Sequence, residues 1–158
     1  MEKPADRLTI AMPRLIVLDT NILVSAMMGT GPAHGALTAC LKRRAIPLVG
    51  TTLLAEYESL LHRPELEPRY LLSITEREAL LDDFLAVCVW QPVYFTWRPN
   101  LRDEGDNHLM ELALAGGAET IITSNIRDFQ GGELRFPRPR VIQPRDWLEE
   151  LRNDHADH

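Results

Sequence analysis

The chain has 158 residues, which is enough for one domain that buries a sizeable core without disulfides. Hydrophobic residues make up 45% and charged residues 25%, as in ordinary globular proteins, and no run reaches the roughly 18 apolar residues of a membrane span. The net charge of −6 argues against nonspecific attraction to nucleic acid through the field of the whole protein, but acids gathered in a metal site would contribute to that total.

Short apolar runs alternate with helical patterns along the chain. The apolar runs predict four strands, over residues 15–18, 46–49, 120–123 and 141–142. Apolar spacing and capping residues predict helices over 22–28, over 32–44, from Thr51 or Thr52 to Pro64, from a Thr75–Glu78 capping box to about Val89, from Asp103 to Gly116-Gly117, and over 144–151. This alternation predicts an α/β sandwich built on a parallel sheet.

No repeat, low-complexity tract or linker divides the sequence. We therefore expect one domain over residues 14–151, with 1–13 and 152–158 as flexible termini. The polar N-terminal stretch does not have the pattern of a signal peptide. Cys40 and Cys88 have no CxxC partner, so we interpret both as reduced core residues of a cytoplasmic protein that has no membrane anchor.

Four acidic residues fall where a strand ends or a helix begins, beside apolar runs. They are Asp19, Glu56, Asp106 and Asp128. Two unit charges about 5 Å apart repel by roughly 3 kcal/mol at an effective dielectric of 20, so such a cluster is costly unless a cation bridges it. Carboxylates at the carboxyl ends of parallel strands also lie where these sheets bind ligands. The four acids therefore predict a site for Mg²⁺ or Mn²⁺, which prefer oxygen ligands and support phosphodiester hydrolysis.

Each acid also has a purely structural interpretation. Asp19 could serve only as a helix N-cap, and Glu56 could be a solvated helix residue like its neighbour Glu58. Asp103 is spaced from the metal candidate three residues later like a capping residue. Asp128 lies in a polar turn, where aspartate is common.

Other catalytic chemistries find little support in the sequence. Ser25 and Ser59 have no evident His and Asp partners, and no phosphate-binding glycine motif is present. His34, His62 and His108 do not have metal-ligand spacing, so we interpret them as surface or helix-edge residues.

Arginine is concentrated between Arg127 and Arg145. Guanidinium groups suit phosphate geometry, so Arg127 and Arg138 are candidates for contacts with an RNA backbone. The alternative is that this stretch is an ordinary solvated loop.

In chain order, four sequence blocks resemble the successive motifs of PIN-domain proteins. The blocks are LIVLDTNILVSA, TTLLAEYESLLHRPEL, RDEGDNHLMELALAGGAETIITSNIRDF and VIQPRDWLEEL, which together span residues 14–151. The similarity is closest to the branch of toxin components of toxin–antitoxin systems, the VapC-like ribonucleases. Each block is short, and their ordered series makes the resemblance specific.

The resemblance implies a three-layer Rossmann-like fold with helices on both faces of the parallel sheet. It also implies a Mg²⁺- or Mn²⁺-dependent endoribonuclease that cleaves single-stranded RNA in the cytoplasm, with an antitoxin protein and a second copy of the chain as partners. By position in the motifs, Asp19, Glu56 and Asp106 match the first three acids of the family. The residues expected to support them are Thr20, Asn21, Asp103, Ser124 and Asn125.

This chain departs from the family pattern at the fourth acidic position. Many members have aspartate where this chain has Asn125, within the block TSNIRD. Asp128 supplies the fourth acid, or Asn125 acts there through its amide oxygen. The departure supports one alternative, a PIN-fold module that binds RNA or protein with impaired metal catalysis. A haloacid-dehalogenase-like phosphatase is a second alternative, but that chemistry needs an aspartate where Asn21 stands.

Overall fold

The protein is described here by a computed structural model, which covers residues 14–94, 107–129 and 139–156. Five parallel strands form one sheet with the spatial order β3-β2-β1-β4-β5. The strands are β1 (Leu15–Leu18), β2 (Ile46–Val49), β3 (Val89–Trp90), β4 (Thr120–Ile122) and β5 (Arg140–Ile142). The α/β fold with an all-parallel sheet is therefore confirmed.

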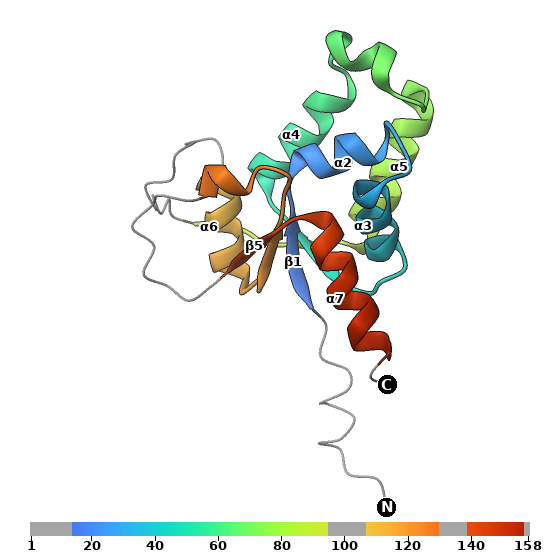
Figure 1. Ribbon diagram of the computed structural model, residues 1–158. Helices are drawn as coiled ribbons and strands as arrows, with labels where there is room; N and C mark the ends of the chain where they lie inside the picture. Colours follow the sequence, from blue (N-terminus) through green and yellow to red (C-terminus); the bar gives the residue numbers. More distant parts are fainter. Residues whose placement is uncertain (1–13, 95–106, 130–138, 157–158) are drawn as a thin grey trace, which may run out of the picture.

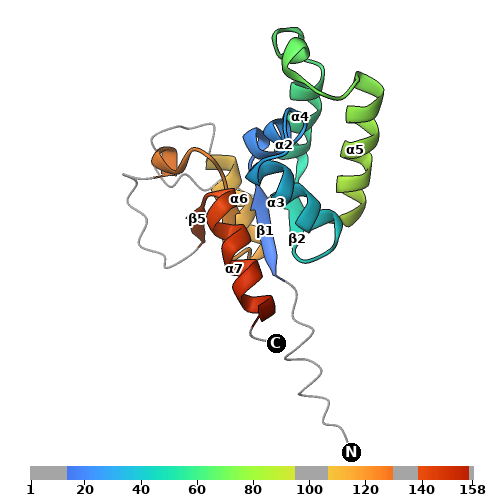
Figure 2. The ribbon, with the colours of Figure 1, turned by 45° about the vertical axis from the view of Figure 1, so that its right-hand side comes forward.

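Helices cover both faces of this sheet (Figure 1). The α-helices are α2 (Thr20–Ala26), α3 (Pro32–Leu41), α4 (Thr51–Leu61), α5 (Ile74–Val87), α6 (Asn107–Gly116) and α7 (Pro144–Ala156). Helix α6 packs on one face against β1, β2 and β4, and α3, α5 and α7 lie on the other face. Helices α2 and α4 lie at the carboxyl ends of the central strands, where Figure 2 shows α2 directly above β1. The arrangement has the three layers that the resemblance implies.

The strand order reverses direction between β1 and β4. The chain first builds outward from β1 through β2 to β3, and then returns to place β4 on the other side of β1. In open α/β sheets, ligands bind in the crevice outside the carboxyl ends of the strands at such a reversal. The backbone amide of Asp19 donates to the carbonyl of Ile122 across this boundary at 3.0 Å. The fold therefore has its default ligand-binding position beside Asp19.

Two helix starts differ from the sequence prediction. Gly50 is the N-cap of α4, and Thr51 and Thr52 are exposed residues of its first turn. Helix α5 begins with a capping box of Ser73 and Glu76, in which each side chain accepts a hydrogen bond from the other residue's backbone amide. The predicted Thr75–Glu78 box has the same spacing two residues further on, so pattern alone did not distinguish the two.

Other boundaries were predicted within a few residues. Helix α2 begins at Thr20, two residues early, and α7 continues through Ala156, beyond the predicted end at Leu151. Helix α6 ends at Gly116, and Gly117 adopts a left-handed conformation with φ of +73°, as the Gly-Gly pair predicted. Strand β3 was missed because it has only two residues and follows directly from a helical pattern.

The segment between α4 and α5 is a ³₁₀ helix, η1 (Pro64–Arg69), which the sequence analysis did not predict. The guanidinium of Arg77, only 1% exposed, fastens this segment to α5. Its Nη2 donates to Glu67 Oε2 at 2.5 Å, and its other nitrogens donate to the carbonyls of Leu61 and Leu72. The Tyr70 ring packs 4.2 Å from the guanidinium carbon in a cation–π contact.

Both cysteines are free thiols in the structure, Cys40 buried and Cys88 half-buried. Burial raises the pKa of each to about 12, so both are poor nucleophiles at neutral pH. Among the helices of the described residues, none combines the length and apolar character needed to cross a membrane.

Candidate functional site

Asp19 directly follows β1 and is 4% exposed. It is the N-cap residue of α2 by position, but its carboxylate makes no capping hydrogen bond to that helix. Both oxygens accept from neighbouring side chains instead. Oδ2 accepts from Thr123 Oγ1 at 2.6 Å and from Asn21 Nδ2 at 3.1 Å, and Oδ1 accepts from Thr20 Oγ1 at 3.3 Å. The carboxylate therefore belongs to a polar network and is not merely a helix cap.

A second ring of hydrogen bonds holds these donors in place. Thr123 Oγ1 accepts from the backbone amide of Asn125 at 3.0 Å, and Asn21 Oδ1 accepts from the backbone amide of Ser124 at 3.4 Å. The network thus joins the end of β1 to the end of β4. Thr20, Asn21, Ser124 and Asn125 were predicted as supporting residues. Thr123 was predicted only as the end of a strand, although a hydroxyl at a strand end beside the reversal was the available signal.

Asp19 is buried without a positive partner in the described part of the chain. Burial raises its pKa, and the negative charge of Glu56 raises it further, whereas the hydrogen bonds from Thr123 and Thr20 lower it. All the side-chain donors to Asp19 are neutral hydroxyl or amide groups. The described donors therefore hold the carboxylate in one orientation without supplying a positive charge to balance it.

Glu56 reaches the same region from α4. The next residue, Tyr57, is 1% exposed, and its hydroxyl donates to the backbone carbonyl of Leu18 at 2.5 Å. Leu18 immediately precedes Asp19, so this bond ties α4 to the end of β1. From the sequence, Tyr57 was predicted only as part of the apolar stripe, since nothing in its spacing indicates where a tyrosine hydroxyl lies.

His108 lies in the first turn of α6, with Nε2 2.7 Å from Glu56 Oε2. Its side chain is 18% exposed, and that of Glu56 is 41% exposed. His108, which was interpreted only as a surface or helix-edge residue, therefore contacts one of the predicted acids directly. His108 lies two residues after the predicted metal ligand Asp106, and this proximity in sequence could have indicated a place near the site.

A hollow of about 280 Å³ opens beside the Asp19 network. Its lining residues in the described chain are Asp19, Thr20, Asn21, Val24, Leu60 and Asn125. The polar part of this lining supplies carboxylate, amide and hydroxyl oxygens, and no sulfur or imidazole. That donor set fits a hard divalent cation such as Mg²⁺ or Mn²⁺, which would also offset the uncompensated charge of Asp19.

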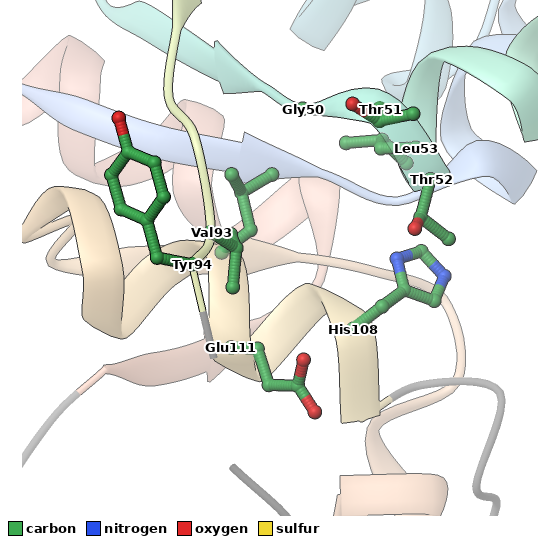
Figure 3. A pocket seen from close by; sticks show the side chains of 9 residues that line it. Gly50, Thr51, Thr52, Leu53, Val93, Tyr94, His108 and Glu111 are labelled. Atoms are coloured by element: carbon green, nitrogen blue, oxygen red, sulfur yellow. The ribbon is translucent and has the colours of Figure 1, made fainter. Parts of the chain in front are cut away.

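A larger cavity of about 620 Å³ lies at the start of α4 (Figure 3). Gly50, Thr51, Thr52 and Leu53 form one side, Val93 and Tyr94 another, and His108, Glu111 and Leu112 of α6 a third. Figure 3 shows the ring of His108 near Thr52 and the ring of Tyr94 on the other side of Val93 in this view. His108 therefore borders this cavity and also contacts Glu56.

Several predicted residues cannot be placed in this geometry. Asp103, Asp106 and Arg138 lie outside the described residues. Asp128 belongs to the ³₁₀ helix η3 (Ile126–Phe129), where its side chain is not described. Arg127 is an exposed residue of the same helix. Within residues 14–94, 107–129 and 139–156, no group of three or more His, Cys, Asp or Glu side chains converges on a point.

The family model of the PIN domain matches residues 15–127, from β1 into η3. No curated protein matches the chain. Among solved structures, the chain is similar to one in the crystal structure of VapBC2 from Rickettsia felis bound to a DNA fragment from their promoter, with a TM-score of 0.56. The two are 20% identical, and the alignment covers 82% of this chain and 98% of that chain. This second likeness concerns the fold. The family match spans most of the sequence, including Asp19, Glu56 and the Thr123 network, and this chain belongs to the PIN-domain family.

Proposed function

We propose that this protein is a divalent-metal-dependent endoribonuclease that cleaves single-stranded RNA. The observation that carries the proposal is the carboxylate of Asp19, buried at the strand reversal and held, among the described residues, by neutral donors without a positive partner. A buried charge without a partner is costly, and a bound cation removes that cost. Membership of the PIN-domain family, whose members are generally nucleases, supports the same chemistry.

Asp19 and Glu56 would hold the metal together with Asp106 and with either Asp128 or Asn125. A bound Mg²⁺ or Mn²⁺ supplies a water of lowered pKa and stabilises negative charge on a phosphoryl oxygen. The residues of the chain itself keep the site in position. Thr123 and Asn21 hold the Asp19 carboxylate in position and fix its rotation through their hydrogen bonds. His108 holds the carboxylate of Glu56 in the same way through the 2.7 Å contact.

An RNA strand across this site would extend past the exposed Arg127 of η3. Arg127 lies in η3, two residues after Asn125, and, with Arg138, would contact backbone phosphates. We expect charge reversal at both positions to weaken RNA binding and to flatten its dependence on salt. An unchanged salt dependence would identify the arginine-rich stretch as a solvated loop.

We further propose a role as the toxin component of a toxin–antitoxin system, with a protein antitoxin and a homodimeric state. The proposal is supported by the sequence resemblance to that branch and by the similar fold in the VapBC2 assembly of Rickettsia felis. We expect the protein to act in the cytoplasm. Co-expression with the product of an adjacent gene, followed by co-purification, tests for the antitoxin.

One observation favours a second candidate, a PIN-fold binding module with impaired catalysis. Asn125 lines the hollow beside Asp19 with a neutral amide, where many family members have an aspartate. A site with fewer carboxylates binds divalent cations less tightly, since its ligand charge is lower. Such a module would bind RNA without cleaving it.

The direct test is cleavage of a labelled single-stranded RNA in Mn²⁺ and in EDTA. We expect cleavage by the wild type in Mn²⁺, none in EDTA, and a loss of about a thousandfold or more in Asp19→Asn and Asp106→Asn, equivalent to about 4 kcal/mol of barrier. Glu58→Gln is the matched control, because Glu58 is exposed on α4 two residues from Glu56. Cleavage that persists in Asp106→Asn would contradict the assigned site, and binding without cleavage in the wild type would favour the module.

A further inference from the structure

We propose that the 620 Å³ cavity at the start of α4 holds one unpaired nucleobase of the RNA, next to the phosphate that is cleaved. This inference rests on the proposed nuclease function and adds the part of the substrate that the second cavity recognises. It also supplies a physical reason for a preference for single strands.

The cavity lies beside the proposed reaction centre. Glu56 is flanked along α4 by Thr52, which lines the larger cavity, and by Leu60, which lines the hollow at Asp19. His108 lines the larger cavity and contacts Glu56 at 2.7 Å. A nucleotide strand with one phosphate at Asp19 and Glu56 would therefore bring a neighbouring base to this cavity.

The cavity has the size and apolar surface that a base requires. Its volume of about 620 Å³ lies in the range of small-molecule sites. Its floor includes Leu53 and Leu112, which are 1% and 3% exposed and so offer fixed apolar surface. Thr51 and Thr52 add exposed hydroxyl groups at the rim, which can donate to or accept from the edge of a base.

Tyr94 provides an aromatic surface at the wall of the same cavity. Its side chain is 89% exposed, the largest exposed fraction among the large hydrophobic residues of the described chain. When a base stacks on this exposed ring, apolar surface of both partners is removed from water, which favours binding. Such stacking is tolerant of sequence, because every base has a flat π face.

The charges of the lining favour a base over a phosphate. Glu111 is the acidic residue of the described lining, which includes no lysine or arginine. A phosphate would be repelled by this carboxylate, whereas a base carries no net charge. A base within a duplex is stacked and paired, so it reaches a cavity only after an unfavourable unstacking step. The cavity would therefore select single-stranded RNA.

The test combines variants of Tyr94 with RNA oligonucleotides that carry one abasic ribose at each position in turn. We expect the abasic substitution at one position beside the cleaved bond to raise the KM of the wild type about tenfold, with smaller effects elsewhere. Tyr94→Ala should raise the KM for the intact RNA by a similar factor with little change in kcat. Tyr94→Phe, which keeps the ring, should restore the wild-type KM.

The two changes should not add, because they remove the same contact. Tyr94→Ala should therefore show no further rise with the abasic RNA. Leu71→Ala is the control, because Leu71 is 69% exposed and lies in the segment between η1 and α5. Additive effects, or a Tyr94→Ala variant with the wild-type KM, would overturn the base pocket but not the nuclease. If the wild type cleaved neither RNA nor bis(p-nitrophenyl) phosphate in Mn²⁺, the proposed function would fail and the pocket with it.

Discussion

Two buried charged side chains, Arg77 and Asp19, are treated differently by the same fold. Arg77 is 1% exposed, donates to two backbone carbonyls and has an anionic partner in Glu67. Asp19 is 4% exposed and accepts, among the described residues, from neutral side chains, and its pKa is raised by burial and further by the charge of Glu56. The charge of Arg77 is compensated by Glu67, whereas Asp19 has no positive partner among the residues that the structure describes. The difference is the one expected between a structural ion pair and the proposed cation site.

The Arg77 cluster should therefore matter for stability and hardly for chemistry. Arg77→Met keeps an unbranched side chain of similar length but removes three hydrogen bonds and the contact with Tyr70. We expect a loss of about 3 kcal/mol in the free energy of unfolding, because the buried carbonyl of Leu61 and the partly buried carbonyl of Leu72 lose a charged donor. Glu67 is 57% exposed, so its carboxylate remains solvated when the guanidinium is removed, which limits the loss of stability. Urea denaturation measures this loss.

Thermal melting should show a fall of roughly 6–12 °C for the same variant. Activity per folded molecule at a temperature below the transition should stay near that of the wild type. A stable Arg77→Met variant with impaired cleavage would contradict the division between the two regions.

A pair of tyrosines, Tyr57 of α4 and Tyr70 directly after η1, provides a finer comparison. Tyr57 donates to the carbonyl of Leu18 beside Asp19, and Tyr70 donates to the carbonyl of Leu60 at 2.9 Å. Removing either hydroxyl should cost about 1 kcal/mol of stability. Only Tyr57→Phe should also weaken Mn²⁺ binding severalfold, because its hydrogen bond sets the distance between α4 and the end of β1.

The measurement for this pair is calorimetric titration of Mn²⁺ into Tyr57→Phe and Tyr70→Phe. Equal metal affinities in the two variants, with equal losses of stability, would mean that Tyr57 is a structural residue with no positioning role.

The smallest expected effect comes from an exposed ion pair far from the site. Arg140 donates two hydrogen bonds of 2.9 Å to the carboxylate of Glu150, and these lower the pKa of Glu150. A carboxyl whose pKa is lower in the folded state adds stability above its unfolded pKa and loses it as pH falls through the folded pKa. Arg140→Gln should therefore cost at most about 0.5 kcal/mol at pH 7. The difference from the wild type should shrink as pH falls below the ordinary glutamate pKa of about 4.3 and vanish once Glu150 is protonated in the folded state. A difference that persisted at pH 3 would assign the cost to packing.

The fold was largely predictable because its signals are local. The apolar runs of β1 and β2 and the start of α3 at Pro32 were located correctly. A buried strand is a continuous apolar run, and a helix start has characteristic residues, so both can be recognised from adjacent positions in the sequence. The two-residue β3 and the η1 helix were missed because they are held by contacts with β2 and with Arg77, which no local pattern records.

The candidate site was predictable only in part. Asp19, Thr20 and Asn21 are adjacent in sequence and were predicted together. Thr123 lies 104 positions from Asp19 and joins it only through the pairing of β1 with β4. His108 likewise meets Glu56 because α6 and α4 pack together, so a contact between distant elements decides its role.

The central claim is that Asp19 belongs to a site completed by a divalent cation. Its most direct test is the change in melting temperature on adding Mn²⁺ in place of EDTA, measured for the wild type, Asp19→Asn and the control Glu58→Gln. A cation that binds only the folded state adds about 2.7 kcal/mol at a hundredfold excess over its Kd. We therefore predict a rise of roughly 5–10 °C for the wild type and Glu58→Gln, and little for Asp19→Asn. Equal rises in all three proteins would contradict the account.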